Sequence, residues 1–179
     1  LILNSGETLE RLFMIYNNIL EAVGHTPMVR LNRMVEEDSA QVLVKFEAVN
    51  VGGSIKTRTA LNMIEEAERK GLIKEDTIIV EPTSGNQGIG LALVGAVKGY
   101  RTIIIMPDSV SEERRKLVRH YGADVKLIHD AGDIGACIDE CLKTALRMQE
   151  KDPRVFVPQQ FANEDNTMAH KNHTALEIM

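Results

Sequence analysis

The segment that decides the fold is TIIVEPTSGNQGIGLALVGAVKGYRTIIIM, residues 77–106. Two runs of mainly β-branched residues, 77–80 and 102–106, flank a stretch of helix length that begins near Asn86 and stops before Gly99. Both runs are continuously apolar rather than alternating, which suits strands that are covered on both faces. A strand, a helix and a second strand in this order predict a parallel pair joined by a crossover helix.

The same alternation continues on both sides of this segment. Further β-branched runs lie at Val42–Glu47, Asp124–Ile128 and Val155–Val157. Helix-length segments lie between them at about Thr57–Lys70, Ser111–Tyr121 and Asp133–Gln149, and another follows Asn163. These spacings predict an α/β fold with a doubly wound, mostly parallel sheet and helices on both faces.

Composition narrows the class of protein. The chain has 179 residues, of which 44% are apolar and 26% charged, enough to bury a sizeable core. The 26 acidic and 21 basic residues give a net charge of −5, which argues against nucleic acid or an anionic membrane as the main partner. We see no apolar run long enough to span a membrane and no secretory leader, so the expected location is the cytoplasm.

The histidines and cysteines do not suggest a metal or redox site. His170 and His173 are three residues apart, but no third ligand lies near them in the sequence, so no metal is expected. Cys137 and Cys141 are one helical turn apart and are best explained by packing, and two cysteines are too few for a disulfide framework.

The turn at 81–90 follows the first strand of the quoted segment and leads into its helix. It carries two hydroxyls, two amides and three glycines. Glycines let the backbone approach a ligand, and the free amides of a first helical turn favour an anion such as a carboxylate or phosphate. An ordinary capped turn has a similar composition, so the pattern alone leaves both interpretations open. The glycine order G-x-x-G-x-G is not the dinucleotide-binding fingerprint.

Lys56 is the second candidate. It follows two glycines and a serine, at the expected entry to an apolar helix. A partly desolvated lysine there could attack an aldehyde as a nucleophile. Taken as an isolated residue, a solvated lysine in a first helical turn is the more common case.

Four stretches, in order and spacing, resemble the cysteine synthase (O-acetylserine sulfhydrylase) and cystathionine β-synthase family of pyridoxal-phosphate enzymes, which have fold type II. They are Gly24–Leu31, Asn50–Arg58, Glu81–Gly90 and Val157–Phe161. The second is close to N-P-G-G-S-x-K-D-R and the third to E-P-T-S-G-N-T-G-I-G. The resemblance runs from about Met14 to Met179 and matches the N-terminal half of the family.

The resemblance implies roles for individual residues. Lys56 matches the catalytic lysine that forms a Schiff base with pyridoxal 5'-phosphate, and Asn86 matches the asparagine that hydrogen-bonds the 3′ oxygen of the cofactor. The site for the substrate carboxylate would be formed by Thr83, Ser84, Gly85, Asn86, Gln87 and Gln160.

The implied activity is a β-replacement that makes L-cysteine from an O-activated L-serine and sulfide through an aminoacrylate. Lys56 would serve as both carbonyl anchor and general base. The implied partners are the amino-acid substrate, sulfide and a second copy of the chain in a homodimer. Cystathionine formation, cysteine desulfhydration and serine or threonine deamination remain alternatives, as does a non-catalytic truncated module.

Several positions depart from the family pattern. Val51 replaces proline, Thr57 replaces aspartate, and Gln87 replaces a threonine that faces the carboxylate in relatives. Glutamine is longer and brings an amide donor, so Gln87 puts the identity of the amino acid in question. The family's phosphate-binding loop has no counterpart before Met179, so the chain alone is expected to be inactive.

The resemblance also predicts how the chain divides. Residues 1–13 would be an N-terminal extension or an artificial remnant, and residues 14–50 would begin a large domain. Residues 51–152 would form a small lobe that carries the lysine and the T-S-G-N turn, and residues 153–179 would return to the large domain.

Overall fold

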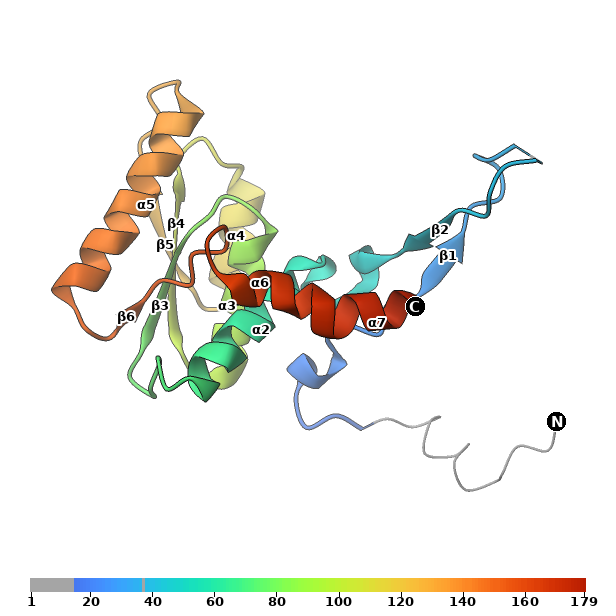
Figure 1. The fold of residues 1–179 in the computed structure, drawn as a ribbon. Coiled ribbons are helices and arrows are strands. Elements are labelled where there is room, and N and C mark those ends of the chain that lie inside the picture. The colour runs from blue at the N-terminus through green and yellow to red at the C-terminus, as the bar shows by residue number, and fades with distance from the viewer. Residues whose placement is uncertain (1–14, 37) are drawn as a thin grey trace.

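A parallel four-stranded sheet forms the centre of the fold in the computed structural model, which describes residues 15–36 and 38–179 (Figure 1). The strand order is β5 (Asp124–Ile128), β4 (Arg101–Pro107), β3 (Ile78–Pro82) and β6 (Val155–Phe156). Ile78 pairs with Arg101 on β4 and with Val155 on β6, so β3 is an inner strand. The parallel α/β arrangement predicted from the sequence is confirmed.

Helices cover both faces of this sheet. Helix α5 (Ile134–Lys151) packs on one face, and α3 (Asn86–Lys98) and α4 (Glu112–His120) pack on the other (Figure 1). Alternate residues of β3 pack on opposite faces of the sheet, because successive side chains of a strand point in opposite directions. Ile79 belongs to the apolar cluster around α3, whereas Ile78 and Val80 belong to the cluster around α5.

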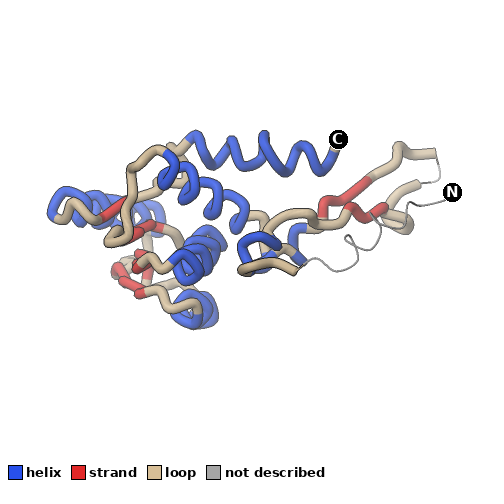
Figure 2. Tube along the Cα trace, turned by 90° about the horizontal axis from the view of Figure 1, so that it is seen from below, coloured by secondary structure: helices blue, strands red, loops and turns tan. Residues whose placement is uncertain are grey.

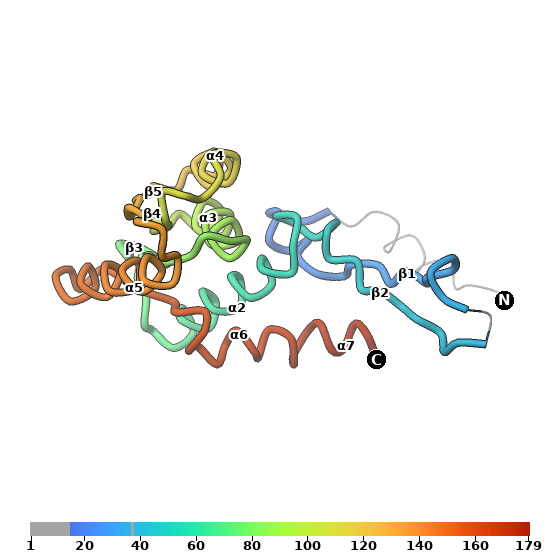
Figure 3. The backbone as a smooth tube through the Cα atoms, turned by 90° about the horizontal axis from the view of Figure 1, so that it is seen from above, coloured from blue at the N-terminus to red at the C-terminus, as the bar shows by residue number. Residues whose placement is uncertain are grey.

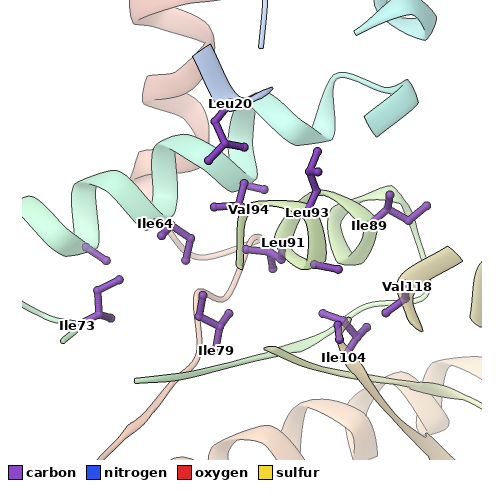
Figure 4. Packing of buried hydrophobic residues seen from close by; sticks show 14 of the residues in the cluster. Leu20, Ile64, Ile73, Ile79, Ile89, Leu91, Leu93, Val94, Ile104 and Val118 are labelled. Carbon is purple, nitrogen blue, oxygen red and sulfur yellow. The ribbon is translucent and has the colours of Figure 1, made fainter. Parts of the chain in front are cut away.

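Helix α3 is apolar nearly all round because it is covered twice. Its inner side contacts the sheet, and α2 (Lys56–Arg69) packs on its outer side (Figure 4). Leu91 and Val94 of α3 and Ile64 of α2 are fully buried in this three-layer stack. Burial of each such side chain stabilises the fold by about 1.5–3 kcal/mol relative to exposure. The start of α3 is therefore held firmly at the carboxyl edge of the sheet.

A strand does form within the predicted range 42–47, but it does not join the parallel sheet, so that part of the expectation was wrong. Leu43–Lys45 forms β2, which pairs antiparallel with β1 (Met28–Arg30), a strand that the sequence analysis missed. The β1–β2 ribbon extends away from the sheet (Figures 2 and 3). None of the described residues between the two strands is helical, which fits an antiparallel pair joined without a crossover helix.

The end of the described chain is helical, as predicted. Helix α6 (Glu164–Ala169), the π turn η4 (His170–Thr174) and α7 (Ala175–Ile178) follow one another and run beside α2 (Figures 1 and 3). The Asn163 side chain accepts a hydrogen bond from the Asp165 amide at 2.9 Å and caps the start of α6. Lys70, at the end of α2, pairs with Asp165 at 2.7 Å.

Short 3-10 turns complete the fold. They are η1 (Ile19–Ala22), η2 (Glu47–Val49) and η3 (Val51–Gly53). Leu20 of η1 is buried against α3, as Figure 4 shows. Within the described residues, none of the helices has both the length and the apolar character needed to cross a membrane. The predicted extension at 1–13 lies outside the described residues, and the division of the chain into lobes stays a prediction.

Candidate active site

Lys56 is the first residue of α2, and two glycines set up its position. Gly52 and Gly53 have φ angles of 78° and 74°, a backbone region that favours glycine. The Lys56 amide donates to Ser54 Oγ at 3.3 Å, which helps to satisfy the first turn of the helix. The Lys56 side chain is half-buried, and no acidic side chain of the described residues lies within ion-pair distance of its ammonium group. Its amine is therefore available for chemistry.

The turn between β3 and α3 is stabilised by local hydrogen bonds. The Gly85 amide donates to Thr83 Oγ1 at 3.2 Å, and Arg114 of α4 donates to the Ser84 carbonyl at 3.1 Å. Gly85 has no atom within 4 Å of where a Cβ would stand, so one side of the turn is open. Asn86 is exposed and begins α3, where backbone N–H groups and the helix dipole favour an anion.

Helices α2 and α3 bring Lys56 and this turn together through their first turns. A Cβ on Gly90 would lie 3.0 Å from the Lys56 carbonyl oxygen and 3.2 Å from Thr57 Cα, so the helices touch at this glycine. The Thr59 hydroxyl donates to Gln87 Oε1 at 2.8 Å across the same contact. Any ligand that spans the starts of the two helices would meet both the lysine and the turn.

Two buried polar atoms at this contact lack a partner among the described residues. They are Gln87 Nε2 and Thr57 Oγ1. Gln87 is only 2% exposed, and its oxygen is already bonded to Thr59. The nitrogen of Gln87 therefore keeps its full capacity to donate, whereas its oxygen already accepts one hydrogen bond.

Gln160 follows β6, the strand next to β3, and lies near the turn that follows β3. It is buried and, with Thr83 and Ser84, lines a cavity of about 90 Å³ that Cys141 of α5 also borders. Lys56, Asn86 and Gln87 do not line this cavity, and Asn86 borders a separate hollow against α4. The structure thus brings Gln160 to Thr83 and Ser84, and brings Lys56 to the start of α3.

Glu81 is a residue of the site that the sequence analysis did not single out. It precedes the turn on β3, is 1% exposed, and accepts hydrogen bonds from the amides of Gln159 and Gln160 at 2.9 and 3.0 Å. Burial raises the pKa of Glu81 to about 7, although the two N–H groups oppose this shift. A glutamate inside an otherwise apolar strand was the signal in the sequence, because a buried carboxyl group needs partners.

A buried charge cluster beside Lys56 was also missed. The guanidinium group of Arg58 contacts Glu47 at 2.9 Å and Glu177 of α7 at 2.5 Å, and Lys45 of β2 contacts Glu177 at 2.6 Å. Hydrogen bonds from Arg58 hold the pKa of Glu177 well below its usual range. The cluster fastens the C-terminal helix and the ribbon to the helix that begins at Lys56.

The pKa of His170 of η4 is lowered in part by the same positive charges. Burial lowers the pKa of His170 first, and the charges of Lys56 and Arg58 lower it further. A cavity of about 480 Å³ lies nearby, along α2 and α7, and is lined by Arg58 and Glu177 but by none of the candidate site residues. The Arg58 cluster thus supports the site from outside it.

Comparisons with known proteins point to one family. A family model described as "Pyridoxal-phosphate dependent enzyme" matches residues 19–179. A cysteine synthase of Flavobacterium sp. is 47% identical over 167 residues, which cover 93% of this chain and 52% of that protein. A probable cysteine synthase of Bacillus subtilis is 44% identical over 92% of this chain and 51% of that protein. The chain spans about half the length of the curated relatives it matches.

Solved structures agree with this assignment. A hydrogen sulfide-producing enzyme from Fusobacterium nucleatum has a TM-score of 0.85 and 43% identity, covering 94% of this chain and 53% of that one. O-ureido-L-serine synthase has a TM-score of 0.80 and 43% identity, covering 92% of this chain and 50% of that one.

Proposed function

This chain belongs to the pyridoxal-phosphate-dependent enzyme family, and from that premise we propose that the protein is a cysteine synthase. It would join sulfide to the β-carbon of an O-activated L-serine and release the activating group. Curated relatives at 44–47% identity that are named cysteine synthases support the proposal. The structural observation that carries it is the position of Lys56, a half-buried residue at the start of α2, where α2 directly contacts α3, the helix that begins within the 83–87 segment.

The residues present fit pyridoxal phosphate as the resident cofactor. The Lys56 amine has no acidic partner among the described residues, so it is free to hold the cofactor aldehyde covalently. The exposed amide of Asn86, at the start of α3, would hold the ring oxygen. The unpartnered Gln87 Nε2 at the same helix contact is a further donor for whatever lies there. When bound, the cofactor withdraws electrons from the amino acid, so that its α-proton becomes acidic and its β-substituent can leave.

The chain's own residues would do the rest of the work. Lys56, once its amine is released, would accept the α-proton as general base. Thr83, Ser84 and the Gly85 amide would bind the substrate carboxylate at the start of α3, where an anion is favoured. Gln160 would close the carboxylate site opposite Thr83 and Ser84. Exclusion of water from this edge would protect the reacting amino acid from hydrolysis.

A second candidate reaction is release of sulfide from L-cysteine. In that elimination the α-proton and the thiol leave cysteine, and water then converts the remaining amino acid to pyruvate and ammonia. The structural similarity to a hydrogen sulfide-producing enzyme favours this candidate. It uses the same lysine and carboxylate site, so assays of sulfide consumption and sulfide release distinguish the two reactions.

The setting of the protein is part of the same proposal. We infer that it acts in the cytoplasm as a homodimer. The support is the resemblance of the chain to cysteine synthases, and sedimentation of the full-length protein would test the dimer.

Covalent labelling tests the proposed function. The full-length protein is incubated with pyridoxal phosphate, reduced with borohydride and mapped by peptide mass spectrometry. The adduct is expected on Lys56 and is expected to vanish in Lys56→Ala. It should persist in Lys70→Ala, which changes a lysine at the other end of α2. An adduct on another lysine, or no adduct, would reject the proposal. So would a protein that neither makes cysteine from O-acetyl-L-serine and sulfide nor releases sulfide from cysteine.

A further inference from the structure

Glu81 is an ionisable group in a place where a neutral side chain would be easier to bury. It is 1% exposed, and it forms no ion pair with any basic side chain of the described residues. Its hydrogen-bond partners are instead two successive backbone N–H groups, those of Gln159 and Gln160, at 2.9 and 3.0 Å. A carboxylate can accept both N–H groups at once, whereas a glutamine side chain offers one oxygen and would turn its own N–H₂ towards the second donor.

The backbone at Gln159 is shaped to present those donors. Gln159 has a φ angle of 54°, in the left-handed region that few residues other than glycine adopt. A left-handed residue in a turn directs successive N–H groups to one side and forms a small anion-binding concavity. Here the acceptor is the chain's own carboxyl group, that of Glu81. The Gln159 side chain is exposed and does not explain this conformation. The two hydrogen bonds to Glu81, together with those that the Gln159 carbonyl accepts from the amides of Ala162 and Asn163, offset its strain.

This contact links the two walls of the cavity that Thr83, Ser84 and Gln160 line. Glu81 lies near the end of β3, two residues before Thr83 of the following turn, and Gln160 lines the same cavity as Thr83 and Ser84. The Gln160 carbonyl also accepts a hydrogen bond from Asn166 of α6 at 2.6 Å, so the turn is held from both ends. The position of Gln160 relative to Thr83 therefore depends on the Glu81 side chain.

We propose that Glu81 is a positioning residue, which holds Gln160 against the Thr83–Ser84 wall through the N–H groups of Gln159 and Gln160 and thereby sets the affinity for the amino-acid substrate. The identity of the ligand rests on the proposed function, whereas the positioning of Gln160 does not. The raised pKa of Glu81 supports a specific need for this group, because the fold retains a carboxyl whose charge is costly to bury.

The primary test uses Glu81→Gln in the full-length protein. Amide hydrogen exchange at Gln159 and Gln160 is expected to accelerate at least tenfold. KM for O-acetyl-L-serine is expected to rise at least tenfold, while kcat changes by less than threefold. Thr77→Val is the matched control, because it removes a buried side-chain acceptor of one backbone N–H, that of Lys74, next to the opposite end of the same strand. It should lower stability but leave KM and the two amides unchanged.

A second pair of variants reaches the same contact without changing the buried carboxyl group. Gln159→Val strains the left-handed backbone at an exposed position, and Gln159→Gly relieves it. The valine variant should reproduce the exchange and KM changes of Glu81→Gln, and the glycine variant should keep the unmodified values. This pair decides the question even if Glu81→Gln fails to fold.

The possible outcomes test the positioning role, the effect on substrate affinity and the proposed function separately. Unchanged exchange at Gln159 and Gln160 in Glu81→Gln and in Gln159→Val would overturn the positioning role. Faster exchange with an unchanged KM would overturn the effect on substrate affinity. If the unmodified protein shows neither the Lys56 adduct nor turnover, the proposed function fails, and the exchange results still decide whether Glu81 holds Gln160.

Discussion

The Thr59 hydroxyl lies 2.8 Å from Gln87 Oε1, and this buried hydrogen bond joins the first turn of α2 to the first turn of α3. The two helices begin at Lys56 and Asn86, so the bond fixes the separation of the lysine from the turn that would bind substrate. Thr57, two residues earlier, is equally buried but its hydroxyl has no partner among the described residues. The two threonines form a natural comparison.

We expect Thr59→Val to destabilise the protein by about 1–3 kcal/mol, because the Gln87 side chain would then be buried without any partner. Thr57→Val should be neutral or stabilising, because it removes a buried hydroxyl that forms no hydrogen bond. Urea unfolding of both variants measures the difference. Equal losses of stability would show that the Thr59–Gln87 bond contributes nothing specific.

Gly90→Ala should push the start of α2 away from α3. The new Cβ would stand 3.0 Å from both the Lys56 carbonyl oxygen and Ala60 Cβ, and neither neighbour can move independently of its helix. We expect a loss of about 1–3 kcal/mol and slower formation of the Lys56 adduct. Gly135→Ala, at an exposed helical position where the nearest atom is 3.4 Å away, should instead stabilise by up to about 1 kcal/mol. A stable Gly90→Ala protein with normal labelling would contradict the close contact.

Arg58→Met should be strongly destabilising because it leaves Glu47 and Glu177 without their shared partner. The Arg58 side chain is 4% exposed, and removal of one member of such a pair costs about 3–5 kcal/mol. Arg69→Met is the control on the same helix, since Arg69 also pairs with a glutamate, Glu66, but is 68% exposed. Its effect should stay within about 0.5 kcal/mol. Chemical denaturation near neutral pH provides the comparison, and similar losses in both variants would refute the buried role of Arg58.

The titration of Glu81 predicts a pH-dependent difference in stability between the unmodified protein and Glu81→Gln. Burial raises the pKa of Glu81 from 4.5 to about 7, so the folded state binds more protons than the unfolded state between these values. The stabilising contribution of the protonated group is complete below pH 4.5 and is lost as the pH rises through 7, by up to about 3 kcal/mol. Unfolding free energies measured from pH 4.5 to 8 give this difference. A difference that is independent of pH would show that Glu81 titrates normally.

The sequence predicted the parallel sheet because its evidence is local. The apolar runs at 77–80 and 102–106 are buried on both faces, and Gly99, with a φ angle of 83°, ends the helix between them as expected. The ribbon was harder to predict, because β1 and β2 have three residues each and Val29, Leu43 and Val44 stay exposed. Strands this short give little periodicity from which to assign a partner.

In the candidate site, too, the residues in local motifs were predicted from the sequence, whereas contacts between distant residues were not. Lys56 and the turn at 83–87 were found from local motifs and the family resemblance, and the structure brings their two helices into contact. The partners of Glu81 and Arg58 could not be found in this way, because they are distant in sequence. Glu81 contacts Gln159 and Gln160, which lie 78 and 79 positions further along the chain. Arg58 contacts Glu177, which lies 119 positions further along. Pattern analysis identifies a buried charge but not its partner.

The separation between Glu81 and Gln160 also bears on the order in which the chain folds. Their hydrogen bond closes a loop of 79 residues, whereas the bond between Thr59 and Gln87 closes one of 28. Long loops cost more entropy to close, and contacts between distant residues slow folding. We therefore expect the pairing of the two helix starts to precede the docking of the Gln159–Gln160 turn. The starts of α2 and α3 would then be joined before the second wall of the cavity, at Gln160, had formed.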